Sequence, residues 1–192
     1  MSKEAGEIPP AARPASAPVA IRPAGPFDLA LLAELHAACF AERWDAPALA
    51  SLLAMPGALA FLAAGALGPG EQSQVEQLPG EQPPGEQPLG FILLRAIAGE
   101  AEIISIGVRP EARRRGIGRR LLEAALAAAA AAGSGRLFLE VAADNWQALA
   151  LYLSYDFTEV GRRPNYYQRN GGGIMALVLS KPILPGGERG AR

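Results

Sequence analysis

The sequence predicts a single domain of the α/β or α+β class, in which helices pack against a sheet. The chain has 192 residues and 50% of them are hydrophobic, which is enough for one domain with a core of its own. Segments with strand-like alternation are interleaved with segments of helical periodicity, as in layered sheet folds. We expect the domain to cover 19–181, between a disordered proline-rich arm at 1–18 and a loose polar tail at 182–192.

In the first half of the chain we expect three strands and two helices. The strands are Val19–Arg22, Ala58–Ala64 and Leu89–Ile97, and the helices are Pro26–Phe40 and the segment from Ala46 to Pro56-Gly57. In the first helix, Phe27 and Leu35 fall on the apolar face, and His36 is expected to be partly exposed. Asp45 is the expected N-cap of the second helix, with Pro47 in its first turn.

A low-complexity insertion separates the strands at Ala58–Ala64 and Leu89–Ile97. The sequence Pro-Gly-Glu-Gln occurs at 69–72, 79–82 and 84–87, among further glycine, proline, glutamine and glutamate. This composition buries too little apolar surface to offset the entropy of an ordered chain. We therefore expect a flexible insertion at 68–88, in a hairpin connection and without a function of its own.

The second half of the chain alternates four strands with two helices. The strands are expected at Glu102–Val108, Arg136–Ala142, Phe157–Arg162 and Ile174–Ser180, and the helices at Gly116–Ala132 and Asn145–Ser154. Within Glu102–Val108, the residues Ile104, Ile106 and Val108 have the same parity and are expected on one face of the sheet.

Composition argues against several classes of protein. The net charge is −1 and the pI is about 5.9, so no overall basic field favours nucleic acid or a membrane surface. The uncharged stretch from Ala46 to Gly70 is broken at Pro56-Gly57 into pieces too short to span a membrane. Cys39 is the one cysteine, which favours a reducing, cytoplasmic location and a buried apolar role. No metal site is expected.

The segment Arg113-Arg114-Arg115-Gly116-Ile117-Gly118 lies between a predicted strand and a predicted helix. Glycines at the start of a helix let a ligand approach the backbone, whose unpaired N–H groups favour anions, and arginines add contacts to phosphate. A P-loop would need Gly-Lys-Ser/Thr, but no lysine lies between Lys3 and Lys181. The dinucleotide fingerprint would need a third glycine, where this chain continues with Arg119-Arg120-Leu121.

This strand, Arg-x-x-Gly-x-Gly and helix resemble the acetyl-CoA motif of the GNAT superfamily of N-acetyltransferases. The resemblance implies a GNAT fold, with a mixed, mostly antiparallel sheet flanked by helices and splayed where acetyl-CoA inserts. It also implies a pantetheine arm that pairs with the backbone of the preceding strand, which would offer an N–H to the thioester oxygen. The pantetheine arm would lie along Ile106, Gly107 and Val108, and the pyrophosphate would lie on Arg113, Arg114, Arg115, Gly116, Ile117, Gly118 and Arg119.

Downstream residues resemble one group of this superfamily, the ribosomal-protein-alanine N-acetyltransferases or RimI group. The matching residues are Leu139-Glu140-Val141, Asn145, Ala148, Leu151-Tyr152, Phe157 and Arg163-Pro164-Asn165-Tyr166-Tyr167, with Phe40 to Trp44 on the substrate side. The resemblance covers 19–181 apart from the insertion. It implies acetylation of a protein N-terminal amine, such as the N-terminal alanine of a small-subunit ribosomal protein.

The chain departs from the pattern of this group at two places. Asp156 replaces the glycine before Phe157, in a turn expected to need a positive φ. Gly171-Gly172-Gly173 replaces an acid and an alanine before Ile-Met, which puts the local substrate contacts in doubt.

The resemblance assigns roles to three residues, each with a simpler alternative. Glu140 would be the general base, or else a salt-bridged strand glutamate. Tyr152 would be the general acid, or else a core tyrosine, and Tyr155 is the competing candidate. Asn145 would bind the pantetheine amide, or else only cap its helix. An acetyltransferase for a small amine or a lysine, and a non-catalytic acetyl-CoA-binding module, are the alternative functions.

Overall fold

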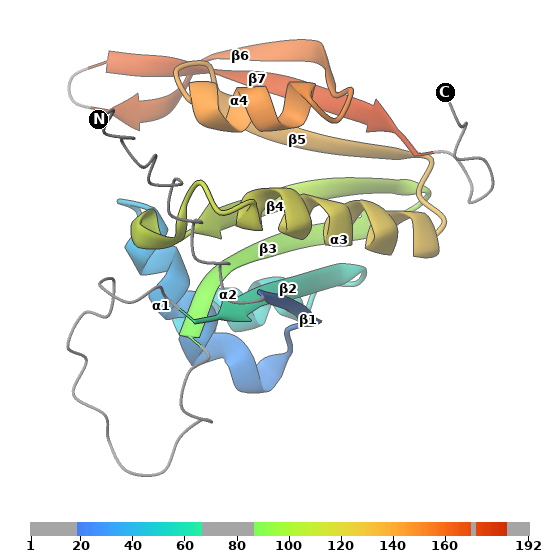
Figure 1. The fold of residues 1–192 in the computed structure, drawn as a ribbon. Helices are drawn as coiled ribbons and strands as arrows, with labels where there is room; N and C mark the ends of the chain where they lie inside the picture. Colours follow the sequence, from blue (N-terminus) through green and yellow to red (C-terminus); the bar gives the residue numbers. More distant parts are fainter. Residues whose placement is uncertain (1–18, 67–86, 170–171, 184–192) are drawn as a thin grey trace, which may run out of the picture.

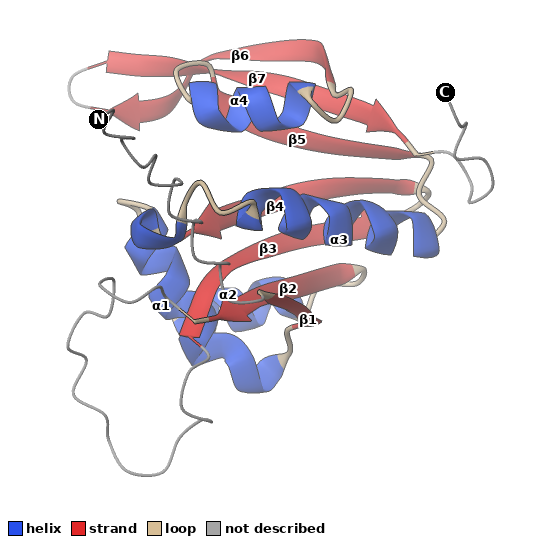
Figure 2. Cartoon of the chain, viewed as in Figure 1, coloured by secondary structure: helices blue, strands red, loops and turns tan. Residues whose placement is uncertain are grey.

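The computed structural model describes residues 19–66, 87–169 and 172–183. A seven-stranded sheet runs through it in the order β1-β2-β3-β4-β5-β7-β6, with helices packed against it (Figures 1 and 2). Strands β4 and β5 are parallel, and the other neighbouring pairs are antiparallel. The mixed, mostly antiparallel sheet predicted from the sequence is confirmed. The predicted arm at 1–18 and most of the insertion and the tail lie outside the described residues.

The bounds of the elements follow the predicted ones closely. The strands are β1 Ala20–Pro23, β2 Ala58–Gly65, β3 Gln87–Ile97, β4 Glu100–Val108, β5 Arg136–Ala142, β6 Thr158–Arg169 and β7 Gly172–Pro182. The α-helices are α1 Leu29–Cys39, α2 Ala46–Leu53, α3 Ile117–Ala131 and α4 Trp146–Leu153, and two 3-10 turns are η1 Pro26–Asp28 and η2 Pro110–Ala112.

Two strands extend well beyond their predicted bounds. Gln87 and Pro88 belong to β3 and pair with Gly65 and Ala64, so this strand begins before the expected Leu89. The strand β6 continues to Arg169, beyond the expected Arg162, because it resumes pairing with β7 after an irregular stretch.

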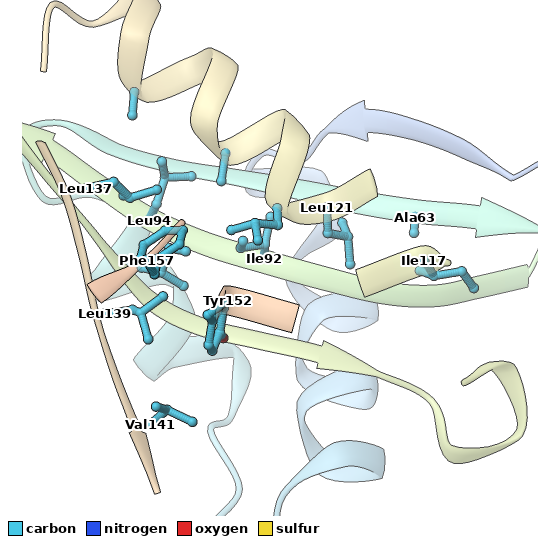
Figure 3. Close-up of a cluster of buried hydrophobic side chains, with 14 of the residues drawn as sticks. Ala63, Ile92, Leu94, Ile117, Leu121, Leu137, Leu139, Val141, Tyr152 and Phe157 are labelled. Carbon is cyan, nitrogen blue, oxygen red and sulfur yellow. The ribbon is translucent and has the colours of Figure 1, made fainter. Parts of the chain in front are cut away.

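The core consists of two clusters of apolar side chains. The larger one packs α3 and α4 on β3, β4, β5 and β7 and includes Leu121, Leu139, Val141, Tyr152 and Phe157 (Figure 3). The smaller one packs α1 and α2 on β2 and β3 and includes Leu32, Leu35, Leu49, Phe91 and Leu93. Since the two clusters take alternate residues of the strands, α3 and α4 cover one face of the sheet, and α1 and α2 cover the other.

Two expectations for the first helix are wrong. The α-helix begins at Leu29, after the 3-10 turn, so Phe27 leaves the apolar face and its side chain is fully exposed. His36 is buried, because its ring stacks on Phe40 and Trp44 at centroid distances of 4.6 and 4.5 Å. Its Nδ1 accepts a hydrogen bond from the Trp44 N–H at 3.2 Å.

Strands β4 and β5 separate part of the way along their length. Their register begins at Glu100 opposite Arg136 and ends at Ile103 opposite Leu139. Beyond this point β4 stays paired with β3 as far as Val108, and β5 stays paired with β7 as far as Ala142. The two strands therefore diverge from right to left in Figure 1 and leave two unpaired strand edges facing each other.

Candidate functional site

Backbone groups of β4 point into the opening between β4 and β5. The Arg109 N–H donates to the Leu89 carbonyl at 2.9 Å, which fixes the alternation of the ladder with β3. In such a ladder every second residue directs its N–H and C=O away from the partner strand. Ile106 and Val108 therefore direct these groups towards the opening, as expected for residues that pair with an extended ligand. The Val108 carbonyl already accepts from Arg113 Nε at 3.1 Å.

Gly107, between them, faces the α1 side of the sheet. A Cβ at this position would lie 2.7 Å from a ring carbon of Phe91 and 2.9 Å from the Cys39 sulfur. The glycine thus lets α1 pack closely against β4. In the same alternation, the N–H and C=O of Gly107 face β3, so neither group points towards the opening.

The loop before α3 forms a turn with unusual backbone angles. Arg114 has φ +64° and Gly116 has φ +76°, and Gly116 is the N-cap of α3 without a side-chain cap. The first hydrogen bond of the helix runs from the Arg120 N–H to the Gly116 carbonyl. The N–H groups of Ile117, Gly118 and Arg119 lie before it, so the helix itself does not satisfy them. Such a helix start favours a phosphate group.

Some residues of this loop can contact a ligand through their side chains, and others only through their backbone. Arg113, Arg114 and Arg119 are exposed, and the Arg119 guanidinium lies 5.8 Å from the centre of the Tyr155 ring. Arg115 is half-buried, because its Nη2 donates to the Ala66 carbonyl at 2.9 Å. Ile117 belongs to the core, so it can contact a ligand through its N–H alone.

Gly118 lies where α3, α4 and the end of β4 meet. A Cβ on Gly118 would lie 3.6 Å from Leu151 Cδ2 and 3.9 Å from Val108 Cγ2, which are ordinary contact distances.

Glu140 lies on the α1 and α2 side of the sheet, at the start of the opening. Its Oε1 accepts from Arg163 Nε at 2.8 Å, and it also accepts a hydrogen bond from Tyr166, which raises the pKa of that phenol. The salt-bridged glutamate considered as the simpler alternative is therefore present in the structure. A carboxylate held in this way can still accept a proton once its partner moves.

Tyr152 lies on the opposite side of the sheet, within the α3 and α4 cluster. Its ring centre is 5.7 Å from that of Phe157, and 3% of the residue is exposed (Figure 3). Burial raises the pKa of the Tyr152 phenol, and nearby Tyr167 adds to the shift. The phenol therefore stays protonated and can act as a hydrogen-bond donor.

Tyr155 contacts α3. Its hydroxyl donates to Glu123 at 2.5 Å, and burial together with this carboxylate raises its pKa to about 12. Tyr155 thus bonds to α3, whereas Tyr152 lies near Tyr167 of β6.

Three further predicted residues have defined places. Asn145 is the N-cap of α4, since the Ala148 N–H donates to its Oδ1 at 3.2 Å. Asp156 has φ +59°, which confirms the expected positive φ of this turn. A Cβ on Gly173 would lie 2.6 Å from Cβ of Asn165, so a residue larger than glycine would collide with β6 there.

Other features of the described chain carry no comparable chemistry. A pocket of about 420 Å³ is lined by apolar side chains and backbone of Pro23–Pro26, Leu29, Ala50, Leu53, Ala54 and Ala58–Phe61. Within residues 19–66, 87–169 and 172–183, no group of three or more His, Cys, Asp or Glu side chains could hold a metal ion. No helix in the same ranges is long and apolar enough to cross a membrane.

Sequence reasoning missed the contacts of Arg163, Tyr166 and Tyr167 with the two candidate catalytic residues. The segment Arg163–Tyr167 resembles a family pattern, but the sequence does not indicate that it contacts Glu140 and Tyr152. They depend on the irregular pairing of β6 with β7 between Arg163 and Tyr167.

Comparisons with known proteins agree with this geometry. A model of the acetyltransferase (GNAT) family matches residues 30–157. The [ribosomal protein bS18]-alanine N-acetyltransferase of Escherichia coli K12 is 38% identical over 93 residues, or 48% of this chain and 63% of that protein. The N-alpha-acetyltransferase RimI of Mycobacterium tuberculosis is 49% identical over 72 residues, or 38% of this chain and 44% of that protein. These matches span less than two thirds of either relative.

Solved structures resemble the chain over more of its length. The crystal structure of the ribosomal-protein-S18-alanine N-acetyltransferase from Escherichia coli has a TM-score of 0.70 and 27% identity, and the match covers 91% of this chain and 99% of that chain. Arabidopsis thaliana NAA60 in complex with acetyl-CoA has a TM-score of 0.69 at 18% identity, with 86% and 99% covered, a likeness of fold.

Proposed function

Because the chain belongs to the acetyltransferase (GNAT) family, we propose that it transfers an acetyl group from acetyl-CoA to the N-terminal amine of a protein. The opening between β4 and β5 is the observation that carries the proposal. Glu140 borders it on one face of the sheet, and Tyr152 lies in the core of the other face. An acyl group between the two strands could thus meet a base and a hydrogen-bond donor from opposite sides.

The residues around the helix start fit the phosphates and the pantetheine arm of acetyl-CoA. The N–H groups of Ile117, Gly118 and Arg119 and the exposed arginines of the preceding loop would bind the pyrophosphate. The outward-facing backbone of Ile106 and Val108 would pair with the amides of the pantetheine arm. Acetyl-CoA would supply the thioester, which carries the acetyl group.

Glu140 would accept the proton that the attacking amine gives up when its nitrogen bonds to the thioester carbon. An α-amino group has a pKa of about 8, so roughly a tenth of it is neutral at pH 7 and a carboxylate suffices as base. An N–H of the β4 backbone would stabilise the oxyanion. The C–S bond then breaks, and the sulfur takes up the negative charge.

Tyr152 would donate a hydrogen bond to that sulfur. Since burial raises the pKa of its phenol, complete proton transfer to a thiolate is unfavourable, and the benefit comes from the hydrogen bond that strengthens as charge develops. The thiolate then takes its proton from water or from the protonated Glu140.

We propose an N-terminal alanine of a small-subunit ribosomal protein as the acceptor, in the cytoplasm. The support is the likeness to enzymes named for ribosomal protein alanine acetylation and the arrangement of Arg163–Tyr167 beside Glu140. A small first side chain suits an amine that must come within about 3–3.5 Å of the thioester carbon.

A competition assay tests the acceptor class. The enzyme receives acetyl-CoA, a peptide that begins with alanine, and the same peptide with a blocked amine and an internal lysine. The free α-amine should be acetylated faster, because a lysine with a pKa of about 10.4 has far less neutral amine at pH 7. Preferred lysine acetylation would favour the side-chain amine as acceptor, and binding of acetyl-CoA without transfer would favour a non-catalytic module.

The pH dependence of a Glu140→Gln variant tests the base. If Glu140 takes the proton, its loss should lower kcat/KM most at low pH, where little amine is already neutral. A loss of equal size from pH 6 to pH 9 would speak for a structural role of the carboxylate.

A further inference from the structure

The candidate base is already occupied by a cation from the same chain. Arg163 Nε lies 2.8 Å from Glu140 Oε1. The Arg163 guanidinium also lies 5.6 Å from the ring centre of Tyr166, whose hydroxyl bonds to the same carboxylate. Arg163 and Tyr166 thus both contact Glu140, from a strand that is not its neighbour in the sheet.

The pairing of β6 with β7 explains how Arg163 reaches Glu140. Arg163 is opposite Ala176, which is opposite Ala142 on β5, so the three side chains share a face with Glu140 two residues away. Ala176 is short and buried, which leaves room for a long side chain to cross β7.

An irregular stretch of β6 then brings Tyr166 to the same carboxylate. Arg163 is opposite Ala176 and Tyr167 is opposite Ile174, so the residues 164–166 face Met175 alone and arch away from β7. Asn165 turns the chain with φ +53°, and Gly173 makes room beneath it.

The two members of the ion pair differ in burial. The Glu140 side chain is 16% exposed, whereas the Arg163 side chain is 58% exposed. A carboxylate with so little access to water needs a partner, while the guanidinium can turn into solvent at small cost. Arg163 is therefore the member of the pair that can leave.

We propose that Arg163 is a displaceable counter-ion of Glu140, which neutralises the carboxylate in the free enzyme and is replaced by the acceptor amine. This inference rests on the proposed function, because it takes Glu140 as the group that receives the amine. An α-ammonium group has the same charge and N–H donors as the guanidinium, so it competes for the same oxygen. Arg163 is a positioning residue that sets how tightly the acceptor binds.

Arg163→Gln tests the inference through peptide binding. The protein is saturated with CoA, which allows no transfer, and a peptide beginning with alanine is titrated by calorimetry. Removing the competitor should lower the Kd of the peptide by roughly two- to fivefold, the factor expected for a half-exposed ion pair. Arg163→Lys keeps a cation beside Glu140 and should bind the peptide like the wild type.

Arg162→Gln is the matched control. Arg162 is the preceding residue of β6, is 61% exposed and pairs with Glu159 at 2.6 Å. Its replacement removes the same charge from the same strand without touching Glu140, so the Kd should stay unchanged. An equal gain in both variants would mean general repulsion of a cationic peptide and would overturn the inference.

The remaining outcomes are also decisive. An unchanged or higher Kd for Arg163→Gln would overturn the inference, and Arg163→Met, which keeps the apolar stem beside Tyr166, replaces it if the Gln variant unfolds. Peptide binding without acetylation in the wild-type protein would refute the proposed function alone. Absence of peptide binding in every variant would refute both.

Discussion

A negative charge at Gly118 should separate cofactor affinity from stability. Gly118 is in the first turn of α3, and a Cβ there would make ordinary contacts with Leu151 and Val108. A side chain can therefore begin at this position without a collision of its Cβ, and Gly118→Asp introduces a carboxylate at the helix start where the phosphates of acetyl-CoA are proposed to bind. Gly118→Asn has nearly the same size without the charge and is the matched control.

The expected loss of affinity follows from Coulomb's law. Two like charges about 5 Å apart repel by about 0.8 to 3 kcal/mol for an effective dielectric constant between about 80 and 20. This corresponds to roughly 4- to 150-fold weaker binding of acetyl-CoA to the Asp variant than to the Asn variant. The Asp variant should nevertheless be more stable than the Asn variant, since an acidic residue in the first turn of a helix stabilises it by about 0.3–1 kcal/mol.

Titration with acetyl-CoA at low and high salt and thermal unfolding provide the two measurements. The difference between the Asp and Asn variants should shrink at high salt, because the proposed repulsion is screened. Equal affinities of the two variants at low salt would refute a phosphate site at this helix start. Gly116 is less suitable for the test, since its φ of +76° would strain any other residue and change stability as well.

Three further changes have defined outcomes. Tyr152→Phe should lower kcat by roughly 100-fold or more with little change in acetyl-CoA affinity, whereas Tyr155→Phe should keep most activity; steady-state kinetics of both variants would expose a wrong assignment if Tyr155→Phe were the damaging one. Asp156→Gly should raise the free energy of unfolding by about 0.5–1 kcal/mol, because φ is +59° at this position, and an unchanged urea midpoint would contradict this explanation. Burial lowers the pKa of the His36 imidazole from its usual 6.5. As the pH falls from 6.5 towards the lowered pKa, the unfolded chain binds a proton that the folded chain does not, so the free energy of unfolding should decrease by up to about 1.4 kcal/mol per pH unit. Urea midpoints at pH 7 and pH 5 should therefore differ less in His36→Gln than in the wild type.

Local sequence signals predicted the regular elements and the special turns well. The strand Arg136–Ala142 has the predicted bounds, and Asp45 caps the helix that it was expected to begin. Asn145 caps α4, which was the simpler of the two roles considered for it. The positive φ of Asp156 was also predictable, because the family pattern that this segment resembles has glycine in this turn. Each of these features depends on residues close together in the chain.

Features that depend on distant residues were missed. His36 is followed by two alanines in the sequence, but Trp44 and Phe91, which lie outside its helix, bury it. The strand beyond Arg162 was not predicted, because Pro164 and charged residues interrupt its alternation. The pairing of Arg163 with Glu140 requires a register across β7 that no local pattern encodes.

A bulge in β4 explains why the alternation of its residues predicted the wrong face for Ile104. Ile104, Ile106 and Val108 were expected on one face, but Ile104 packs against the α1 and α2 cluster, while the other two pack against the α3 and α4 cluster. The register explains the difference: Leu94 is opposite Ile103 and Leu93 is opposite Ser105, so Ile104 is the extra residue of a bulge. One extra residue inverts the faces that follow it, and it also bends and twists the strand. Ile103 is the last residue of β4 that pairs with β5. The same bulge that reverses the parity therefore accounts for β4 turning away from β5. Ile103 and Ile104 are adjacent and both apolar, so each face of the sheet receives an apolar side chain at this point, and the alternation in the sequence does not reveal the bulge.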